Sequence, residues 1–217
     1  MKILALDLST RKGSVALCRA GAPPARLGGA RQAERPPYKP LAQRQWANDR
    51  RNSASFFRAL EEIVRAHGGP ERVVVGLGPG SYTGTRIAIS AGIGLEVTSG
   101  AQLCGIPSIC AISTEEDFVV IGDARRGSFF LARILHGAVA GEIELLSSKE
   151  MAQRISETAV SIYTSDDLPQ FSRARLSYPR AELLCRLAED SQNLVRAPLT
   201  PIYLRAPHIT APRALCI

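Results

Sequence analysis

The chain has 217 residues and a formal net charge of +7, with 45% hydrophobic and 22% charged residues. This composition is typical of a globular protein that forms one large domain or two small ones. No apolar run approaches the ~20 residues of a membrane helix, and Asp7 interrupts the first run too early for a signal peptide. We therefore expect a cytoplasmic protein with no membrane segment.

Cysteine and histidine spacing argues against metal or disulfide frameworks. The five cysteines form no CxxC pair, and we expect buried free thiols. The three histidines lie far apart and show no HExxH spacing, so no metal site is expected. The cysteines are Cys18, Cys104, Cys110, Cys185 and Cys216.

Periodicity and turn residues predict an α/β chain with two related halves. The predicted strands span 2–7, 14–19, 25–33, 73–75, 102–105, 118–122, 128–135, 142–146 and 159–163. The predicted helices span 53–66, 85–99, 148–155 and 179–189. Ser147 and Glu150 have the spacing of a capping box. Because strands followed by a helix occur twice, we expect two subdomains, 1–110 and 111–217, with the last residues packing back on the first.

A glycine-rich stretch, 76–86, lies between a predicted strand and a predicted helix. This order aims backbone amides at whatever lies before the helix, as in phosphate-binding loops. A tight connection without a ligand explains the stretch equally well, because glycine-rich motifs are often coincidental. The candidate phosphate-binding residues here are Gly78, Gly80, Ser81, Thr83 and Gly84.

Two carboxylates lie at the ends of predicted strands: Asp7 is the last residue of the first, and Asp123 follows the strand 118–122. With Ser9 and Thr10 they form the rest of a candidate phosphate or nucleotide site, in which the two carboxylates could hold Mg²⁺. The alternative is that Asp7 and Ser9 bond turn amides, as these residue types commonly do. Pairs of groups for acid–base or nucleophilic catalysis are not visible, so no catalytic residue is assigned.

The helices before and after the glycine stretch have unusual faces. The first carries a bulky apolar face, and the second a face of small residues that would let another helix approach closely. A core role is the default interpretation, and a partner or dimer interface is the second. The residues concerned are Phe56, Phe57, Leu60, Ile63, Val64, Ala88, Ala91, Gly92 and Leu95.

The segment from Arg19 to Arg51 holds eight basic and two acidic residues, a net charge of +6. A solvated loop is the favoured interpretation, because aromatic residues are few there. A stand-alone RNA-binding patch is the alternative.

Four motifs, in the same order along the chain, resemble those of the bacterial TsaB/YeaZ family. They are the opening segment 2–17, the segment Gly78-Pro79-Gly80-Ser81-Tyr82-Thr83-Gly84-Thr85-Arg86-Ile87, the segment 123–127 and the late segment 201–205. The chain departs from the family pattern at Asn52, at Ile93 and at Ser128.

The resemblance implies an actin-like (ASKHA) α/β fold with two RNase H-like subdomains of mixed sheet plus helices. It also implies a non-catalytic subunit of the complex that makes N6-threonylcarbamoyladenosine at position 37 of tRNA. The implied partners are a TsaD-like paralogue, a TsaE-like ATPase and, through the complex, tRNA, with a homodimer in isolation. ATP or ADP with Mg²⁺ is implied at the level of the complex. The alternative is an independent nucleotide-binding ATPase or phosphotransferase of the actin-like superfamily; a protease is not expected.

Overall fold

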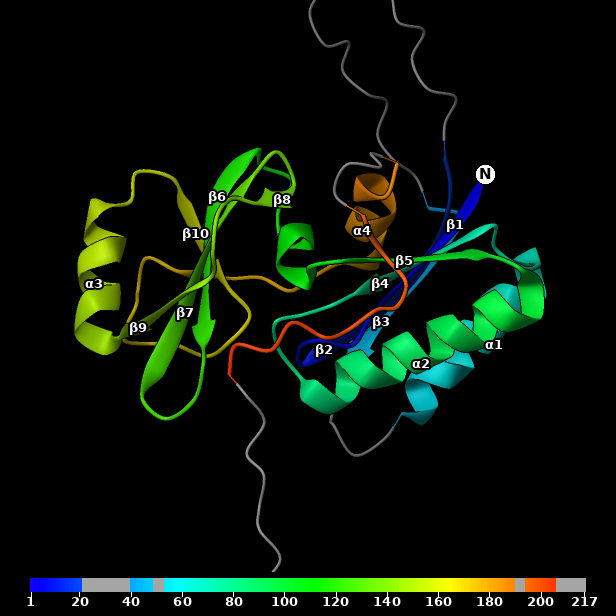
Figure 1. The fold of residues 1–217 in the computed structure, drawn as a ribbon, viewed down its shortest axis with the longest axis horizontal. Coiled ribbons are helices and arrows are strands. Elements are labelled where there is room, and N and C mark those ends of the chain that lie inside the picture. Colours follow the sequence, from blue (N-terminus) through cyan, green and yellow to red (C-terminus); the bar gives the residue numbers. More distant parts are fainter. Residues whose placement is uncertain (21–39, 49–52, 190–193, 206–217) are drawn as a thin grey trace, which may run out of the picture.

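The computed structural model describes residues 1–20, 40–48, 53–189 and 194–205. These residues form two β-sheets with helices packed on them (Figure 1). Sheet A has the strand order β12-β5-β4-β1-β2-β3, and sheet B has the order β11-β10-β6-β7-β8, with β9 also paired to β7. Sheet A consists of β1 (Lys2–Asp7), β2 (Lys12–Arg19), β3 (Ala42–Ala47), β4 (Arg72–Gly76), β5 (Gln102–Ile106) and β12 (Val195–Arg196). Sheet B consists of β6 (Asp117–Asp123), β7 (Ser128–Leu135), β8 (Ala138–Val139), β9 (Glu144–Ser147), β10 (Ser161–Thr164) and β11 (Arg175–Leu176). The helices are α1 (Ala54–His67), α2 (Tyr82–Ser99), the short 3₁₀ helix η1 (Ser108–Ala111), α3 (Ser148–Glu157) and α4 (Ala181–Leu187).

The two sheets repeat one topology. In sheet A, β1, β2 and β3 are antiparallel neighbours, and β4 and β5 join in parallel on the other side of β1. In sheet B, β6, β7 and β9 are antiparallel neighbours, and β10 and β11 join in parallel beside β6. In each half a helix precedes the first parallel strand. The repeat confirms the expectation of two related halves.

Alternate side chains of β1 enter two different cores, as the two-residue period of a strand requires. Leu4 and Leu6 belong to the core beneath α1 and α2, together with Phe56. Ile3 and Ala5 belong to a central core that includes α4 and one face of sheet B. Figure 1 shows α1 and α2 on one side of sheet A and α4 on the other.

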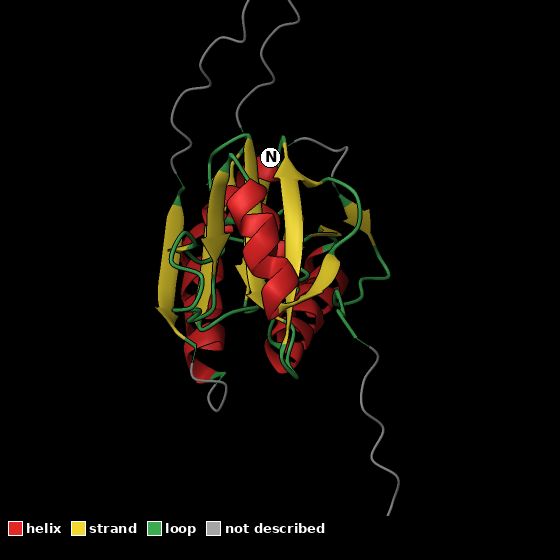
Figure 2. Cartoon of the chain, turned by 90° about the vertical axis from the view of Figure 1, so that its left-hand side faces the viewer, coloured by secondary structure: helices red, strands yellow, loops and turns green. Residues whose placement is uncertain are grey.

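The opposite face of sheet B packs against α3. Figure 2 shows this helix in front of the strands of sheet B. Ser147 caps α3 by accepting a hydrogen bond from the Glu150 amide, and the Glu150 side chain bonds back to the Ser147 amide. The capping box predicted from the sequence is therefore confirmed.

The last described residues return to the first half of the chain. Helix α4 packs on β1 and β2, and Cys185 Sγ lies 3.5 Å from the Ile3 carbonyl oxygen. Strand β12 pairs with β5 at the edge of sheet A. Near the expected boundary at 110, η1 connects β5 to β6.

Several predicted elements differ in detail. Helix α2 begins at Tyr82 instead of Thr85, because Ser81 caps it. The third strand of the first half is β3, whereas the strand expected at 25–33 lies outside the described residues. Sequence reasoning missed strand β3 because only Ala42 and Trp46 pack on the core, and the other four side chains are exposed, so the alternating apolar pattern is weak.

The cysteine prediction is confirmed within the described ranges. Cys18, Cys104, Cys110 and Cys185 are buried free thiols, and Cys216 lies outside the described residues. Burial raises the pKa of Cys104 to about 11 and that of Cys110 to about 12. None of the described helices has the length and apolar composition needed to cross a membrane.

Candidate functional site

A cleft lies between the two halves and gathers much of the predicted phosphate site. It is lined by the turn after β1, the loop before α2, the β6–β7 hairpin, the turn after β10 and the segment 201–205. The predicted residues that line it are Ser9, Thr10, Gly80, Ser81 and Asp123. Asp7, Gly78, Thr83 and Gly84 are not among the lining residues.

Asp7 is fully buried and does not line the cleft. Its carboxylate Oδ1 accepts hydrogen bonds from the backbone amide of Ser9, at 2.9 Å, and from the Ser9 hydroxyl, at 2.8 Å. Burial raises the pKa of Asp7, and the hydroxyl of Ser108 and the two Ser9 donors oppose the rise. A Cβ on Gly76 would lie only 1.9 Å from Asp7 Oδ2. The side chain is therefore enclosed by the chain itself, as the turn-bonding alternative expects.

The glycine-rich loop interlocks with the turn after β1. A Cβ on Gly80 would lie 2.1 Å from the carbonyl oxygen of Ser9, and one on Gly84 would lie 2.1 Å from that of Leu8. The Ser81 amide donates to the Ser9 carbonyl oxygen at 2.6 Å. These glycines thus permit a close approach of two backbone segments, which gives them a reason within the fold.

Three of the four side-chain hydroxyl groups predicted for phosphate binding have partners within the chain. Ser9 donates to Asp7, Thr10 donates to the Lys12 carbonyl oxygen, and Ser81 accepts from the Gly84 amide. The Ser81 bond caps the first turn of α2. The structure therefore favours the interpretation of a tight connection over that of a phosphate cradle.

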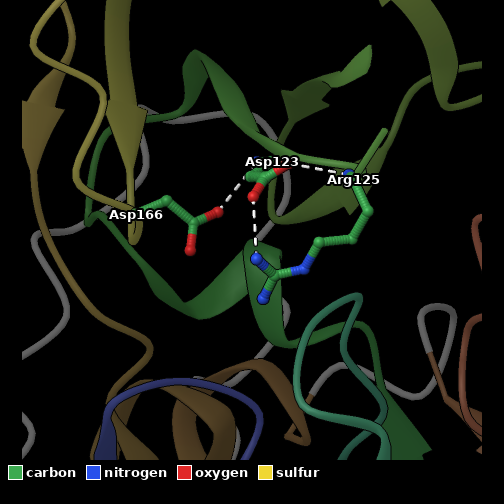
Figure 3. A network of polar contacts seen from close by, with 3 residues as sticks. All are labelled: Asp123, Arg125 and Asp166. Atoms are coloured by element: carbon green, nitrogen blue, oxygen red, sulfur yellow. Dashed lines mark hydrogen bonds and ion pairs between the residues drawn. The ribbon is translucent and has the colours of Figure 1, made fainter. Parts of the chain in front are cut away.

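The Asp123 carboxylate is bonded to Arg125, a residue of the same β6–β7 hairpin (Figure 3). Its Oδ1 accepts from the Arg125 amide at 2.7 Å, and its Oδ2 pairs with the Arg125 guanidinium at 2.9 Å. The Asp123 amide donates to Asp166 Oδ2 at 2.9 Å. Arg125 and Arg126 have φ angles of 67° and 55°, in the left-handed region that side chains rarely adopt.

The two carboxylates considered for Mg²⁺ do not fit that role in this arrangement. Asp7 is fully buried outside the cleft lining, and both oxygens of Asp123 are bonded to Arg125. Mg²⁺ requires several oxygen ligands in near-octahedral geometry. In the described part of the chain, no three His, Cys, Asp or Glu side chains gather as a possible metal site.

The segment 201–205 lines part of the cleft. The Ile202 amide donates to the Leu77 carbonyl oxygen at 2.8 Å, which ties the segment to the glycine-rich loop. The Tyr203 ring lies 5.4 Å from the ring of Tyr82, between centroids. Arg86 lies 4.1 Å above the Tyr82 ring and donates from Nε to the Tyr203 hydroxyl at 3.1 Å. This hydrogen bond raises the pKa of Arg86.

The bulky face of α1 is mainly a core face. Phe56, Leu60 and Ile63 are buried against sheet A, so their assignment to a partner interface must be corrected. The hydrophobic periodicity predicted the face, and sheet A covers it. Val64 is partly buried, whereas Phe57 stays 49% exposed beside Phe56.

The small-residue face of α2 also turns inward. Ala88 is buried, and a Cβ on Gly92 would lie 2.9 Å from Leu103 Cδ1 and 3.0 Å from Val75 Cγ2. The close approach expected at these residues is therefore made by sheet A, and their interface assignment is corrected. Ala91 and Leu95 are partly buried at the edge of the same core.

The opposite side of α2 is uncovered by the described residues. We call Ser90, Ile93, Gly94 and Val97 the α2 face; all four are exposed, Ile93 at 46% and Val97 at 78%. A Cβ on Gly94 would meet nothing within 4 Å. The sequence groups Gly94 with Gly92 among the small residues of this helix, because periodicity alone does not tell which side of a moderately apolar helix the sheet covers.

The fold and the cleft define the class of protein. Two halves of RNase H-like topology, joined face to face around a cleft at the ends of their first strands, form an actin-like α/β fold. The predicted fold class is thereby confirmed.

The comparisons with known proteins refine this class. No family model matches the chain. It is 27% identical over 178 residues to an uncharacterised protein of Mycobacterium tuberculosis, covering 78% of this chain and 80% of the relative. A Pseudomonas aeruginosa protein described as similar to peptidase YeaZ has a TM-score of 0.70 at 21% identity. YeaZ of Pseudomonas aeruginosa has a TM-score of 0.66 at 20% identity, and each alignment covers 94% of this chain and 99% of the other. The chain thus has the YeaZ fold, in agreement with the resemblance found in its motifs.

Proposed function

We propose that this chain is a TsaB/YeaZ-type scaffold subunit of the complex that makes N6-threonylcarbamoyladenosine at position 37 of tRNA. In this role it pairs with and activates a TsaD-like transferase in the cytoplasm, and a TsaE-like ATPase joins them. The YeaZ fold and the four ordered motifs support the assignment. The observation that carries the docking role is the uncovered α2 face.

The α2 face has a composition that a monomer does not need. Glycine in a helix interior costs about 1 kcal/mol relative to alanine, and Gly94 has no neighbour that would exclude a methyl group. Ile93 and Val97 each leave much of their apolar surface in water. Complete burial of such side chains is worth roughly 1.5–3 kcal/mol each. A partner surface that approaches closely at Gly94 would account for both features.

The engaged polar groups of the cleft support a binding role over independent chemistry. Ser9, Ser81 and Asp123 use their side chains for bonds within the chain, and Asp7, buried outside the cleft lining, has only its Oδ1 bonded, to Ser9, while its Oδ2 has no partner among the described residues. A catalytic site keeps such groups available to the substrate, in positions set by the fold. According to this proposal, the bonds around the cleft stabilise the fold of the subunit, and the α2 face binds the partner.

Co-purification with the TsaD-like protein of the same organism tests the proposal. We expect a tagged chain to form a complex of defined mass in size-exclusion chromatography with light scattering. We expect the Ile93→Glu variant to lose it, because a charge would be buried at the contact. In the complete set of purified proteins, Ile93→Glu should also abolish formation of the modified nucleoside, measured by mass spectrometry of digested tRNA.

Leu145→Glu is the matched control, since Leu145 on β9 of sheet B is 43% exposed and similarly apolar. It should leave both the complex and tRNA modification intact. Without the partner, we expect self-association through the α2 face, which Ile93→Glu should also disrupt. Robust ATP hydrolysis by the isolated chain, lost on Asp7→Ala, would instead favour the independent ATPase.

A further inference from the structure

Arg86 is held in a fixed position at the end of the α2 face. Its guanidinium lies over the Tyr82 ring, and its Nε donates to the Tyr203 hydroxyl. Tyr82 and Tyr203 are in contact with each other and remain 47% and 42% exposed. Two segments far apart in the sequence therefore meet to orient one exposed cation.

The charge of Arg86 is not compensated within the described residues. None of the ion pairs among these residues includes Arg86, although other exposed arginines have carboxylate partners, as Arg65 has Glu61 and Arg133 has Asp117. An arginine whose side chain is already ordered loses little conformational entropy when it binds a carboxylate. Tyrosine and arginine are also enriched among the residues that dominate binding energy at protein interfaces.

The position of Arg86 connects it to the α2 face. Residues four apart on a helix lie on the same side, so Tyr82, Arg86 and Ser90 form a stripe that continues to Ile93 and Val97. The far end of this stripe is apolar and uncharged. Such a surface suits a protein that covers apolar side chains along the helix, whereas RNA would require further cations along it.

We propose that Arg86, clamped between Tyr82 and Tyr203, is the anchor at which the docking partner places a carboxylate. This inference rests on the proposed function and specifies the chemistry of the partner surface. That surface is apolar where it faces Ile93 and Val97, and it carries an aspartate or glutamate opposite Arg86. Tyr203 acts as a positioning residue, because it orients the guanidinium through its hydroxyl group.

Affinity measurements with the purified TsaD-like partner test the anchor. Arg86→Glu should weaken binding about 100-fold, because it places two negative charges together. Arg86→Lys should weaken it about tenfold, since lysine lacks the planar fork that binds a carboxylate through two bonds. Tyr203→Phe, which keeps the ring and removes the hydroxyl, should weaken binding about threefold through lost orientation.

Lys149→Glu is the matched control, because it reverses an exposed charge on α3, which packs on sheet B away from α2. It should leave the affinity unchanged, and all variants should keep the thermal midpoint of the wild type. Replacing each acidic residue of the partner with arginine in turn should identify one variant that restores binding to Arg86→Glu. That rescue is the readout that a purely structural role of Arg86 would not produce.

The outcomes separate this inference from the proposed function. If Ile93→Glu abolishes binding while Arg86→Glu does not alter it, the docking role stands and the anchor is refuted. If the wild-type protein does not bind the partner, both the docking role and the Arg86 anchor are refuted. If Arg86→Glu leaves partner affinity intact but weakens tRNA binding with a steep salt dependence, the residue serves RNA and the anchor is overturned.

Discussion

Two glycines of α2 provide a matched test of how this helix is covered. Gly92 and Gly94 lie two residues apart in the middle of the same helix, and neither has a positive φ angle. Alanine at either site gains the same ~1 kcal/mol of helix propensity. The two substitutions therefore differ only in what the new methyl group meets.

The structure assigns opposite surroundings to the two methyl groups. At Gly94 the added Cβ meets nothing within 4 Å, so Gly94→Ala should stabilise the protein by the full ~1 kcal/mol. At Gly92 it would lie 2.9 Å from Leu103 Cδ1 and 3.0 Å from Val75 Cγ2. Overpacking of a well-filled core costs about 1–3 kcal/mol, so Gly92→Ala should be between neutral and about 2 kcal/mol destabilising.

Thermal denaturation of both variants beside the wild type measures the difference in stability. A gain of 1 kcal/mol corresponds to about 2–4 °C in the thermal midpoint for a chain of this size. We expect Gly94→Ala to raise the midpoint and Gly92→Ala to leave it unchanged or lower it. If Gly92→Ala stabilises as much as Gly94→Ala, α2 does not pack on sheet A as described, and the α2 face is misassigned.

Three further substitutions probe the cleft and α3. Gly80→Ala should destabilise by at least about 3 kcal/mol and reduce the soluble yield, because its Cβ would lie 2.1 Å from a backbone oxygen of Ser9; normal yield and stability would contradict the interlocked turn. Burial raises the pKa of Asp7 above its unfolded value of about 3.9, so the folded state holds this proton more tightly, and that stabilisation is lost as the pH rises through the raised pKa. The urea midpoint of Asp7→Asn should therefore rise relative to that of the wild type as the pH rises above about 4. A difference between the two midpoints that does not change with pH would contradict a raised pKa of Asp7. Ser147→Ala should cost about 1 kcal/mol by removing the capping box, whereas Ser148→Ala, one position later, should not; equal losses would show that the cap contributes little.

Local patterns in the sequence were sufficient for much of the fold. The apolar run 73–75 predicted β4, and the apolar periodicity of 53–66 predicted α1. Ser147 and Glu150 predicted the start of α3, because a cap depends on residues only three apart. The repeated order of strands and helices predicted two halves, and the sheet topology confirms them.

The candidate site depended on contacts that the sequence does not contain. The glycines at 80 and 84 predicted a close approach, but a phosphate and a neighbouring backbone satisfy that pattern equally. The structure shows that the neighbour is the turn after β1. Likewise, Asp123 carries the same carboxylate whether it is free to bind a ligand or bonded to Arg125.

The sequence by itself determined most of the longer strands and helices, the cap of α3 and the motifs that this chain shares with the YeaZ-like proteins, but not strand β3 or the two-residue strands β8, β11 and β12. Only the tertiary structure decided which side of α2 meets sheet A, and that Tyr203 reaches Arg86 across 117 positions of the chain. The physical reason is that propensity, capping and periodicity act over a few neighbouring residues. Burial and exposure are set by segments that come together only when the whole chain folds.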